Sequence, residues 1–328
     1  MSKFDVPLVE RVYRKSDDLT ASLKRFPEDF VVDELWQPEF SGDGEHLYLQ
    51  VEKVGQNTAW VAQQLAKVFG AVKKDVGYSG LKDRQAITRQ WFSLTVPAER
   101  AQIEPQIEGV KILQRGRHSH KLRRGTHAGN RFAIRLRDLE GDLESHQGLL
   151  AERLDAVAEH GFPNYFGSQR FGRGGNNLRT GMQLSARRQL IKHPKRGIYL
   201  SAMRSALFNG VLAEQIRLGN WPEILASAYP ATGPMWGRGR PIAAEIGADV
   251  EARIVGEQSE LCDILEHGGL SQERRPLVQK CTDFNYSIEG ADLLLSFDLP
   301  PGSYATVLIE ELVAIRHERD HLSPNIQG

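Results

Sequence analysis

The sequence predicts an α+β fold, with a mixed α/β first part followed by a region of different composition. Three observations lead to this expectation. Some short segments alternate apolar and polar residues as strands do, others space apolar residues as helices do, and a loop-rich stretch begins at Gly161. The 328 residues, 40% of them hydrophobic and 26% charged, are enough for one large or two medium globular domains.

The first part of the chain predicts strands around one helix. Residues 46–54 alternate as a strand does, and residues 76–79 and 89–96 are further strand candidates. The helix is predicted over 58–69, where it would end at Gly70. Its apolar residues recur at helical spacing: Val61, Leu65 and Val68.

Residues 131–139 predict a strand with one apolar and one basic face. The apolar side chains are Phe132, Ile134 and Leu136. The basic side chains are Arg131, Arg135 and Arg137. Such a strand fits a sheet whose open side meets phosphate, and the alternative is an ordinary amphipathic edge strand.

The rest of the chain is predicted to be more helical and loop-rich, and its last strand and helix resemble the elements of the first part. A helix over 145–160 is expected to end at Gly161, and after the loop-rich stretch a long helix covers 201–218. Residues 292–299 predict a strand, followed by a helix from about Ser303. The middle is therefore expected to be an insertion, with the C-terminal part returning to the first domain.

The net charge is zero, but the basic residues are segregated. No acidic residue occurs between Glu108 and Asp138, or from His160 to Ala213. These two stretches hold 18 of the 42 Lys and Arg residues and leave 24 basic residues against 42 acidic ones in the rest. Segregation of this kind is typical of a polyanion-binding face, and the alternative is a pair of solvated basic surfaces.

Cysteine usage and hydropathy point to a reducing compartment. Cys262 and Cys281 are the only cysteines, so neither a disulfide framework nor a structural zinc site is expected. No long apolar run predicts a membrane span, and the first residues do not resemble a secretory signal. We expect a cytoplasmic protein without a membrane or metal partner.

The segment most suggestive of chemistry is residues 76–95. Asp83 follows a glycine turn and stands between Lys82 and Arg84. Nearby cations favour the ionised form of a carboxylate, and an ionised, positioned Asp can act as a nucleophile. A salt-bridged surface turn is the alternative that these residues leave open.

Six segments, in order from residue 24 to 312, resemble motifs of the TruD family of pseudouridine synthases. They are LKRFPEDFVVDE (23–34), GLKDRQAITRQWF (80–92), GTHAGNRF (125–132), FPNYFGSQRFG (162–172), RSALFN (204–209) and LPPGSYATVLIEEL (299–312). One position departs from the family pattern, because Tyr304 stands where the family often has Phe. An aromatic face is kept there, with a hydroxyl added.

The resemblance implies a mixed α/β pseudouridine-synthase catalytic domain with an inserted α/β domain. The implied limits are 1–160 for the first catalytic part, 161–278 for the insertion and 279–328 for the C-terminal return. It also implies the isomerisation of a tRNA uridine, at position 13, to pseudouridine. That reaction needs no cofactor, no metal and no obligate protein partner.

Site residues follow from the same resemblance. Asp83 is the implied nucleophile and Lys24 its electrostatic partner. Residues implied to contact the substrate uridine are Phe30, Asn130, Phe132 and Tyr304. Core packing is the alternative for the three aromatic residues, and an ordinary turn position is the alternative for Asn130. Residues expected on the RNA backbone are Arg123, Arg124, Arg131, Arg135, Arg170 and Arg173.

Three other functions were weighed against this one. A non-catalytic RNA-binding protein would keep the basic stretches and use Asp83 structurally. A methyltransferase would need a donor pocket with a glycine-rich turn after a strand, which the sequence does not show. A metal-dependent nuclease would need clustered acidic residues or histidines, which the basic stretches lack.

Overall fold

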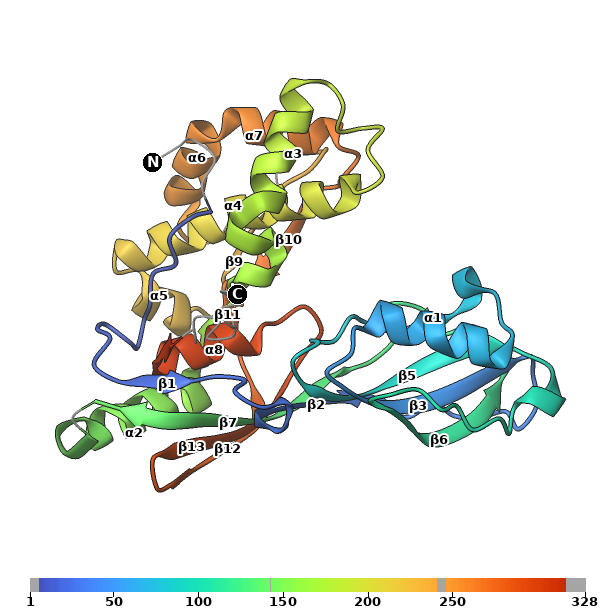
Figure 1. The fold of residues 1–328 in the computed structure, drawn as a ribbon. Coiled ribbons are helices and arrows are strands. Elements are labelled where there is room, and N and C mark those ends of the chain that lie inside the picture. The colour runs from blue at the N-terminus through green and yellow to red at the C-terminus, as the bar shows by residue number, and fades with distance from the viewer. Residues whose placement is uncertain (1–5, 142, 241–245, 317–328) are drawn as a thin grey trace, which may run out of the picture. The chain divides into compact units, whose positions relative to one another are not determined.

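A computed structural model gives the fold and describes residues 6–141, 143–240 and 246–316. The chain divides into two compact units, each built from three separate stretches (Figure 1). The sheet unit comprises the described residues of Asp18–His146, Cys281–Gly302 and Ala314–Gly328. The helical unit comprises those of Met1–Asp17, Gln147–Lys280 and Ser303–Val313. The predicted α+β fold is confirmed, while the domain limits expected at residues 160 and 278 stay a prediction.

One sheet of ten strands forms the sheet unit within the described residues. Seven strands follow the order β12-β13-β7-β2-β5-β3-β6. Their bounds are Phe30–Leu35 (β2), His46–Val54 (β3), Ile87–Thr95 (β5), Val110–His118 (β6), Gly129–Glu140 (β7), Thr282–Glu289 (β12) and Asp292–Leu299 (β13). The others are β1 (Thr20–Ser22) beside β7 and β14 (Ala314–Arg316), and β4 (Gly77–Tyr78) beside β5. The β2–β5 and β1–β14 pairs are parallel, and the other pairs are antiparallel.

Helix α1 (Thr58–Phe69) covers β3 and β5 on one face of the sheet (Figure 1). The Asn57 side chain accepts hydrogen bonds from two backbone N–H groups of its first turn, and Gly70 ends it at φ +67°. The core between helix and sheet includes Leu47, Leu49, Val51, Val61, Leu65, Phe69, Phe92 and Leu94. The helix predicted over 58–69 is confirmed. Val68 is 36% exposed, because Phe69 takes the buried position on the helix instead.

Strand β7 lies between β2 and β13, and its buried apolar face matches the predicted one. Phe132 lies opposite Val32 on β2 and opposite Phe297 on β13. Its ring centroid is 6.0 Å from that of Phe30 and 5.4 Å from that of Phe297. Because Phe132 is 8% exposed, these aromatic contacts form part of the core.

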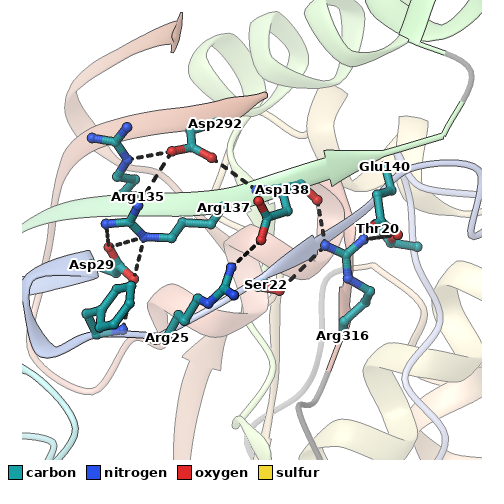
Figure 2. Close-up of polar contacts among 11 residues, drawn as sticks. Thr20, Ser22, Arg25, Asp29, Arg135, Arg137, Asp138, Glu140, Asp292 and Arg316 are labelled. Carbon is teal, nitrogen blue, oxygen red and sulfur yellow. Dashed lines mark hydrogen bonds and ion pairs between the residues drawn. The ribbon is translucent and has the colours of Figure 1, made fainter. Parts of the chain in front are cut away.

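The basic face of β7 meets carboxylates of neighbouring elements. Arg135 Nε donates to Asp292 at 2.7 Å, and Arg137 Nε donates to Asp29 at 2.8 Å (Figure 2). Burial alone would raise the pKa of Asp292. The hydrogen bonds from Arg135 and the Asp138 amide, together with the charges of Arg135 and Arg137, bring that pKa below its usual value. The same strand carries Arg131, whose Nε donates to Asp298 at 2.8 Å.

The helical unit is organised around α4 (Arg196–Arg217), which begins earlier than the predicted residue 201. Helix α4 packs against α3, α6, α7 and β9. The other helices are α2 (Leu143–His160), α3 (Asn176–Ala186), α5 (Trp221–Ala226), α6 (Ala248–Glu257), α7 (Ser259–His267) and α8 (Ala305–Leu312). Two small ribbons join β8 (Phe162–Pro163) to β11 (Val278–Gln279) and β9 (Thr232–Met235) to β10 (Glu273–Pro276). None of the helices described is both long and apolar enough to cross a membrane.

Candidate active site

Asp83 lies in the connection between β4 and β5 of the sheet unit. Its side chain is 27% exposed, so its carboxylate is open to solvent and to a substrate. The neighbouring Leu81 is 67% exposed, whereas Ala86 is fully buried where β5 is about to begin. The connection therefore presents Asp83 at the surface and is tied to the core at its end.

Buried polar side chains hold the backbone of this connection. Thr58 Oγ1 accepts a hydrogen bond from the Lys82 amide at 3.0 Å. Gln90 Nε2 donates to the Gly80 carbonyl at 3.1 Å. Thr58 and Gln90 are fully buried and bond each other at 3.0 Å, so two points of the connection share one rigid support.

Lys53 supplies a third support. It is fully buried on β3, on the strand face that also carries Leu49 and Val51, and its Nζ donates to the Asp83 carbonyl at 2.7 Å. Burial lowers the pKa of Lys53 to about 8, although the negative charge of Asp83 acts in the opposite direction. An amino group is thus kept in the core at the point where it fixes the backbone of Asp83.

Lys24 is the ion-pair partner of the Asp83 carboxylate. Its Nζ lies 2.6 Å from Asp83 Oδ2, and the Lys24 side chain is 13% exposed. The same ammonium group lies 3.9 Å from the centroid of the Phe30 ring. Lys24 reaches this place with φ at +60°, in the left-handed region that a lysine rarely adopts.

A buried ion pair lies beside the connection. Glu34 accepts hydrogen bonds from Lys82 Nζ at 3.0 Å, from the Trp91 amide at 3.0 Å and from the Ser79 hydroxyl. His127 Nδ1 is 3.9 Å from Glu34, but burial and the nearby Lys82 lower the pKa of this imidazole. At neutral pH the ion pair is therefore Glu34 with Lys82, and His127 is neutral.

The other sequence-predicted residues of the sheet unit lie close to these groups in the fold. Phe30 is 2% exposed and its ring links the core residue Phe132 to the Lys24 ammonium. Asn130 lies on β7 opposite Glu34 of β2. The buried Oδ1 atom of Asn130 has no hydrogen-bond partner among the residues that the structure describes. A buried acceptor without a partner is costly unless a ligand supplies the donor.

Tyr304, Arg170 and Arg173 belong to the helical unit. Tyr304 precedes α8, and its hydroxyl accepts a hydrogen bond from Arg170 Nε at 3.0 Å. Arg170 also donates to Ser201 Oγ at 2.8 Å, and its guanidinium carbon lies 5.2 Å from the centroid of the Phe166 ring. Arg173 is exposed. Tyr304 and Arg170 are thus neighbours in this unit.

The basic residues expected on the RNA backbone differ in their partners. In the sheet unit Arg131 and Arg135 are paired with carboxylates, so their charge is compensated within the protein. Arg123 and Arg124 are exposed, and no described carboxylate forms an ion pair with either. Contact of any of these four arginines with RNA stays a prediction.

The sequence interpretation missed the supports of the Asp83 connection. Lys53 falls on the same strand face as three apolar residues, and a lysine at such a position signals an unusual buried amino group. Glu34 lies within the quoted LKRFPEDFVVDE segment but was not singled out. Thr58 and Gln90 carry no comparable signal, because their partners are backbone groups of a distant segment.

A family model described as tRNA pseudouridine synthase D (TruD) matches residues 10–188 and 224–312. The chain belongs to the TruD family. The resemblance found in the six motifs is thereby confirmed, and Asp83 with its supports lies within the matched TruD region.

Relatives of this TruD chain are similar over most of their length. The tRNA pseudouridine synthase D of Cellvibrio japonicus is 43% identical over 316 residues, which is 93% of each chain. That of Pseudomonas syringae pv. tomato is 42% identical over 327 residues, covering 89% of this chain and 91% of the relative. The crystal structure of a putative tRNA pseudouridine synthase D from Methanosarcina mazei has the same fold, with a TM-score of 0.67 at 19% identity over 95% of this chain and 97% of that one.

Proposed function

We propose that this chain is a tRNA pseudouridine synthase that converts uridine 13 of its substrate tRNA into pseudouridine, with Asp83 as the nucleophile. Membership of the TruD family supports the reaction class. The observation that carries the choice of residue is the geometry of Asp83. Its half-buried carboxylate pairs with Lys24 at 2.6 Å, while its own carbonyl is held by buried Lys53. A carboxylate fixed in this way is accessible and oriented for attack.

The reaction is an isomerisation that needs one positioned carboxylate. The bond between N1 and C1′ breaks, the uracil rotates, and a bond forms between C5 and C1′. C5 then loses its proton and N1 gains one, so atoms and charge balance without a cofactor. Asp83 acts by attack on C1′, by attack on C6 or by assisting loss of the 2′ proton, and each route needs the ionised form. The Lys24 ammonium, 2.6 Å from Asp83 Oδ2, orients the carboxylate and offsets its charge.

The target base has to leave its stack to reach Asp83, at a cost of roughly a few kcal/mol. We assign recognition of the flipped base to the Asn130 carbonyl oxygen, which is buried and has no partner among the described residues. Uracil offers an N3–H donor that fits this acceptor. In the helical unit, considered by itself, Tyr304 offers an aromatic ring on which a base of the tRNA can stack, and such stacking returns about 1–3 kcal/mol per base.

The basic stretches are assigned to the tRNA backbone. Arg123 and Arg124 in the sheet unit and Arg170 and Arg173 in the helical unit would contact phosphates, which positions the RNA without reading its sequence. The same assignment applies to Arg131 and Arg135 after exchange of their carboxylate partners. A tRNA substrate fits a cytoplasmic protein, and the isomerisation requires no metal, membrane or obligate protein partner.

Tritium release tests this function. The purified protein is incubated with unmodified tRNA that carries tritium at uridine C5, because forming the C5–C1′ bond expels that hydrogen. We expect release by the wild type, none by Asp83→Asn, and wild-type release by Asp43→Asn, which removes the same charge from an exposed position of the sheet unit. All three should bind tRNA equally. Binding without release by the wild type would instead favour a non-catalytic RNA-binding protein.

A further inference from the structure

A cavity of about 580 Å³ lies in the sheet unit between α1, the segment leading into β4 and the loop between β6 and β7. This size is in the range of small-molecule sites. We call it the basic pocket, after its lining of five cations and one aromatic ring: Lys73, Lys74, Tyr78, Lys121, Arg123 and Arg124. No acidic residue lines it among the residues that the structure describes.

The charge of the basic pocket is not compensated by the protein. No described carboxylate lies within ion-pair distance of any of its five cations. Lys121 donates to the Lys74 carbonyl at 2.8 Å and Lys73 to Gln63 Oε1 at 3.2 Å, and both acceptors are neutral. Arg131 and Arg135 on β7 show the opposite arrangement, since each meets a carboxylate. The pocket is therefore a place where an external anion is needed to balance the charge.

An aromatic surface lies beside the cations. Tyr78 lines the pocket, and its ring centroid is 5.8 Å from the guanidinium carbon of Arg124 and 6.0 Å from the Phe92 centroid. Apolar atoms of Ala59 and Ala62 form the α1 side. A ring fixed against the core next to several cations suits a planar base attached to a phosphate better than it suits a bare anion.

The basic pocket adjoins the connection that carries Asp83. Tyr78 precedes Ser79, whose carbonyl accepts a hydrogen bond at 2.8 Å from Gly125, the residue after Arg124. On the other side, Ala59 follows Thr58, which accepts a hydrogen bond from the Lys82 amide. Each pocket segment thus leads directly into a residue that holds the Asp83 connection.

We propose that the basic pocket binds a nucleotide of the substrate tRNA close to the target uridine, with its phosphate on the cations and its base on Tyr78. This rests on the proposed function only in taking tRNA as the RNA. A nucleotide held here fixes the tRNA on the sheet unit beside the target uridine, and the contact contributes equally to substrate binding and to the transition state.

The test compares charge removal in the pocket with equal charge removal elsewhere. The pocket variant is Lys74→Gln with Arg124→Gln, both at exposed positions, and its conservative counterpart is Lys74→Arg with Arg124→Lys. The control is Lys67→Gln with Lys280→Gln, two exposed lysines outside the pocket. Binding of an unmodified tRNA transcript is measured between 50 and 200 mM salt, about the range over which phosphate contacts change affinity most clearly. Thermal unfolding of every variant checks its fold.

We expect the pocket variant to raise the Kd roughly tenfold and to reduce the slope of log K against log salt by about 0.7–0.9 per lost contact. Its KM should rise with kcat unchanged, since the contact is made before the chemical step. The conservative variant and the control should behave as the wild type. Tyr78→Leu should raise the Kd roughly tenfold with no change of slope, because stacking releases no counterion.

Two results would overturn the proposal that the basic pocket binds a nucleotide of the tRNA. One is a pocket variant whose Kd and salt slope equal those of the control. The other is an equal loss in the conservative and the Gln variants, which would show that charge is not what the RNA senses. Absence of tritium release by the wild type would instead defeat the proposed isomerisation, while the binding data would still decide the pocket.

Discussion

The Lys24 ammonium group lies 2.6 Å from Asp83 Oδ2, although the Lys24 backbone has to adopt a φ of +60° to bring it there. A non-glycine residue in this region costs about 1–3 kcal/mol and persists only where its surroundings hold it. The same ammonium lies over the Phe30 ring, which is itself packed in the core. The strain is thus found at the residue that orients the candidate nucleophile.

Replacing Lys24 should separate this backbone strain from its role beside Asp83. Lys24→Gln keeps the strain and removes the charge, whereas Lys24→Gly removes both. We expect both to lower kcat about 100-fold, because the carboxylate loses its orienting partner. The free energy of unfolding of Lys24→Gly should be about 1 kcal/mol larger than that of Lys24→Gln, because glycine adopts this φ without strain. Tritium release and urea unfolding measure the two effects, and a wild-type kcat in Lys24→Gln would show that Asp83 needs no such partner.

Lys53 should make stability depend on pH above neutrality. Its pKa is about 8 in the folded protein against an ordinary 10.5, so between these values the unfolded chain binds more protons than the folded one. Below pH 8 the buried charge of Lys53 therefore lowers the unfolding free energy of the wild type by its full amount. This destabilisation disappears as the pH rises to 10.5. We expect the unfolding free energy of Lys53→Met, relative to wild type, to fall by about 3 kcal/mol over this range.

Urea unfolding at a series of pH values measures this difference. Lys67→Met at an exposed position of α1 is the control, and its difference from wild type should stay constant with pH. If the difference in unfolding free energy between Lys53→Met and the wild type also stayed constant with pH, the buried amino group of Lys53 would have an ordinary pKa. Lys53→Met should also lower kcat at every pH, because the Asp83 carbonyl loses its donor.

The Glu34–Lys82 pair should show strong coupling. Glu34→Gln leaves the Lys82 ammonium, 5% exposed, without its carboxylate and should cost about 3–5 kcal/mol of unfolding free energy. Lys82→Met in the same chain removes that buried charge, so the double variant should be destabilised by less than the sum of the single ones. A double-mutant cycle by urea unfolding measures this, and additive losses would argue against a buried ion pair.

Asn130 should matter for the substrate more than for the fold. Its Oδ1 atom forms no hydrogen bond within the described part of the chain, so Asn130→Ala forfeits none through this atom. We expect an unfolding free energy within about 1 kcal/mol of wild type and a kcat/KM lowered about tenfold, the loss of one neutral hydrogen bond. A loss of stability that accounts for the loss of activity would identify a packing residue instead.

Elements with strong local signals could be predicted with their bounds. The strand alternation of His46–Val54 and of the segment Asp292–Leu299 gave β3 and β13, and the cap at Asn57 with the stop at Gly70 gave α1. These features are decided by neighbours in sequence, so one sequence contains them. The buried face of α1 was less certain, since Val68 and Phe69 are adjacent apolar residues and packing on the sheet selects Phe69.

Features that depend on distant partners could not be predicted in the same way. The sequence shows three arginines on one face of β7, but their carboxylates come from other segments; Arg131 pairs with Asp298 through the register of β7 with β13. Lys53 likewise meets the Asp83 carbonyl through the packing of β3 beneath the connection. The local sequence pattern determines which face of the strand a side chain occupies, whereas strand register and packing determine which residue it contacts there.

The position of β13 has a consequence for biosynthesis. Strand β7 is complete at Glu140, yet its partner on one side begins only at Asp292. At roughly 5–20 residues per second, the ribosome delivers that partner about 10–30 s later. During this interval the nascent sheet has an open edge that can pair with another chain, so we expect newly made molecules to depend on chaperones for protection until translation is almost finished.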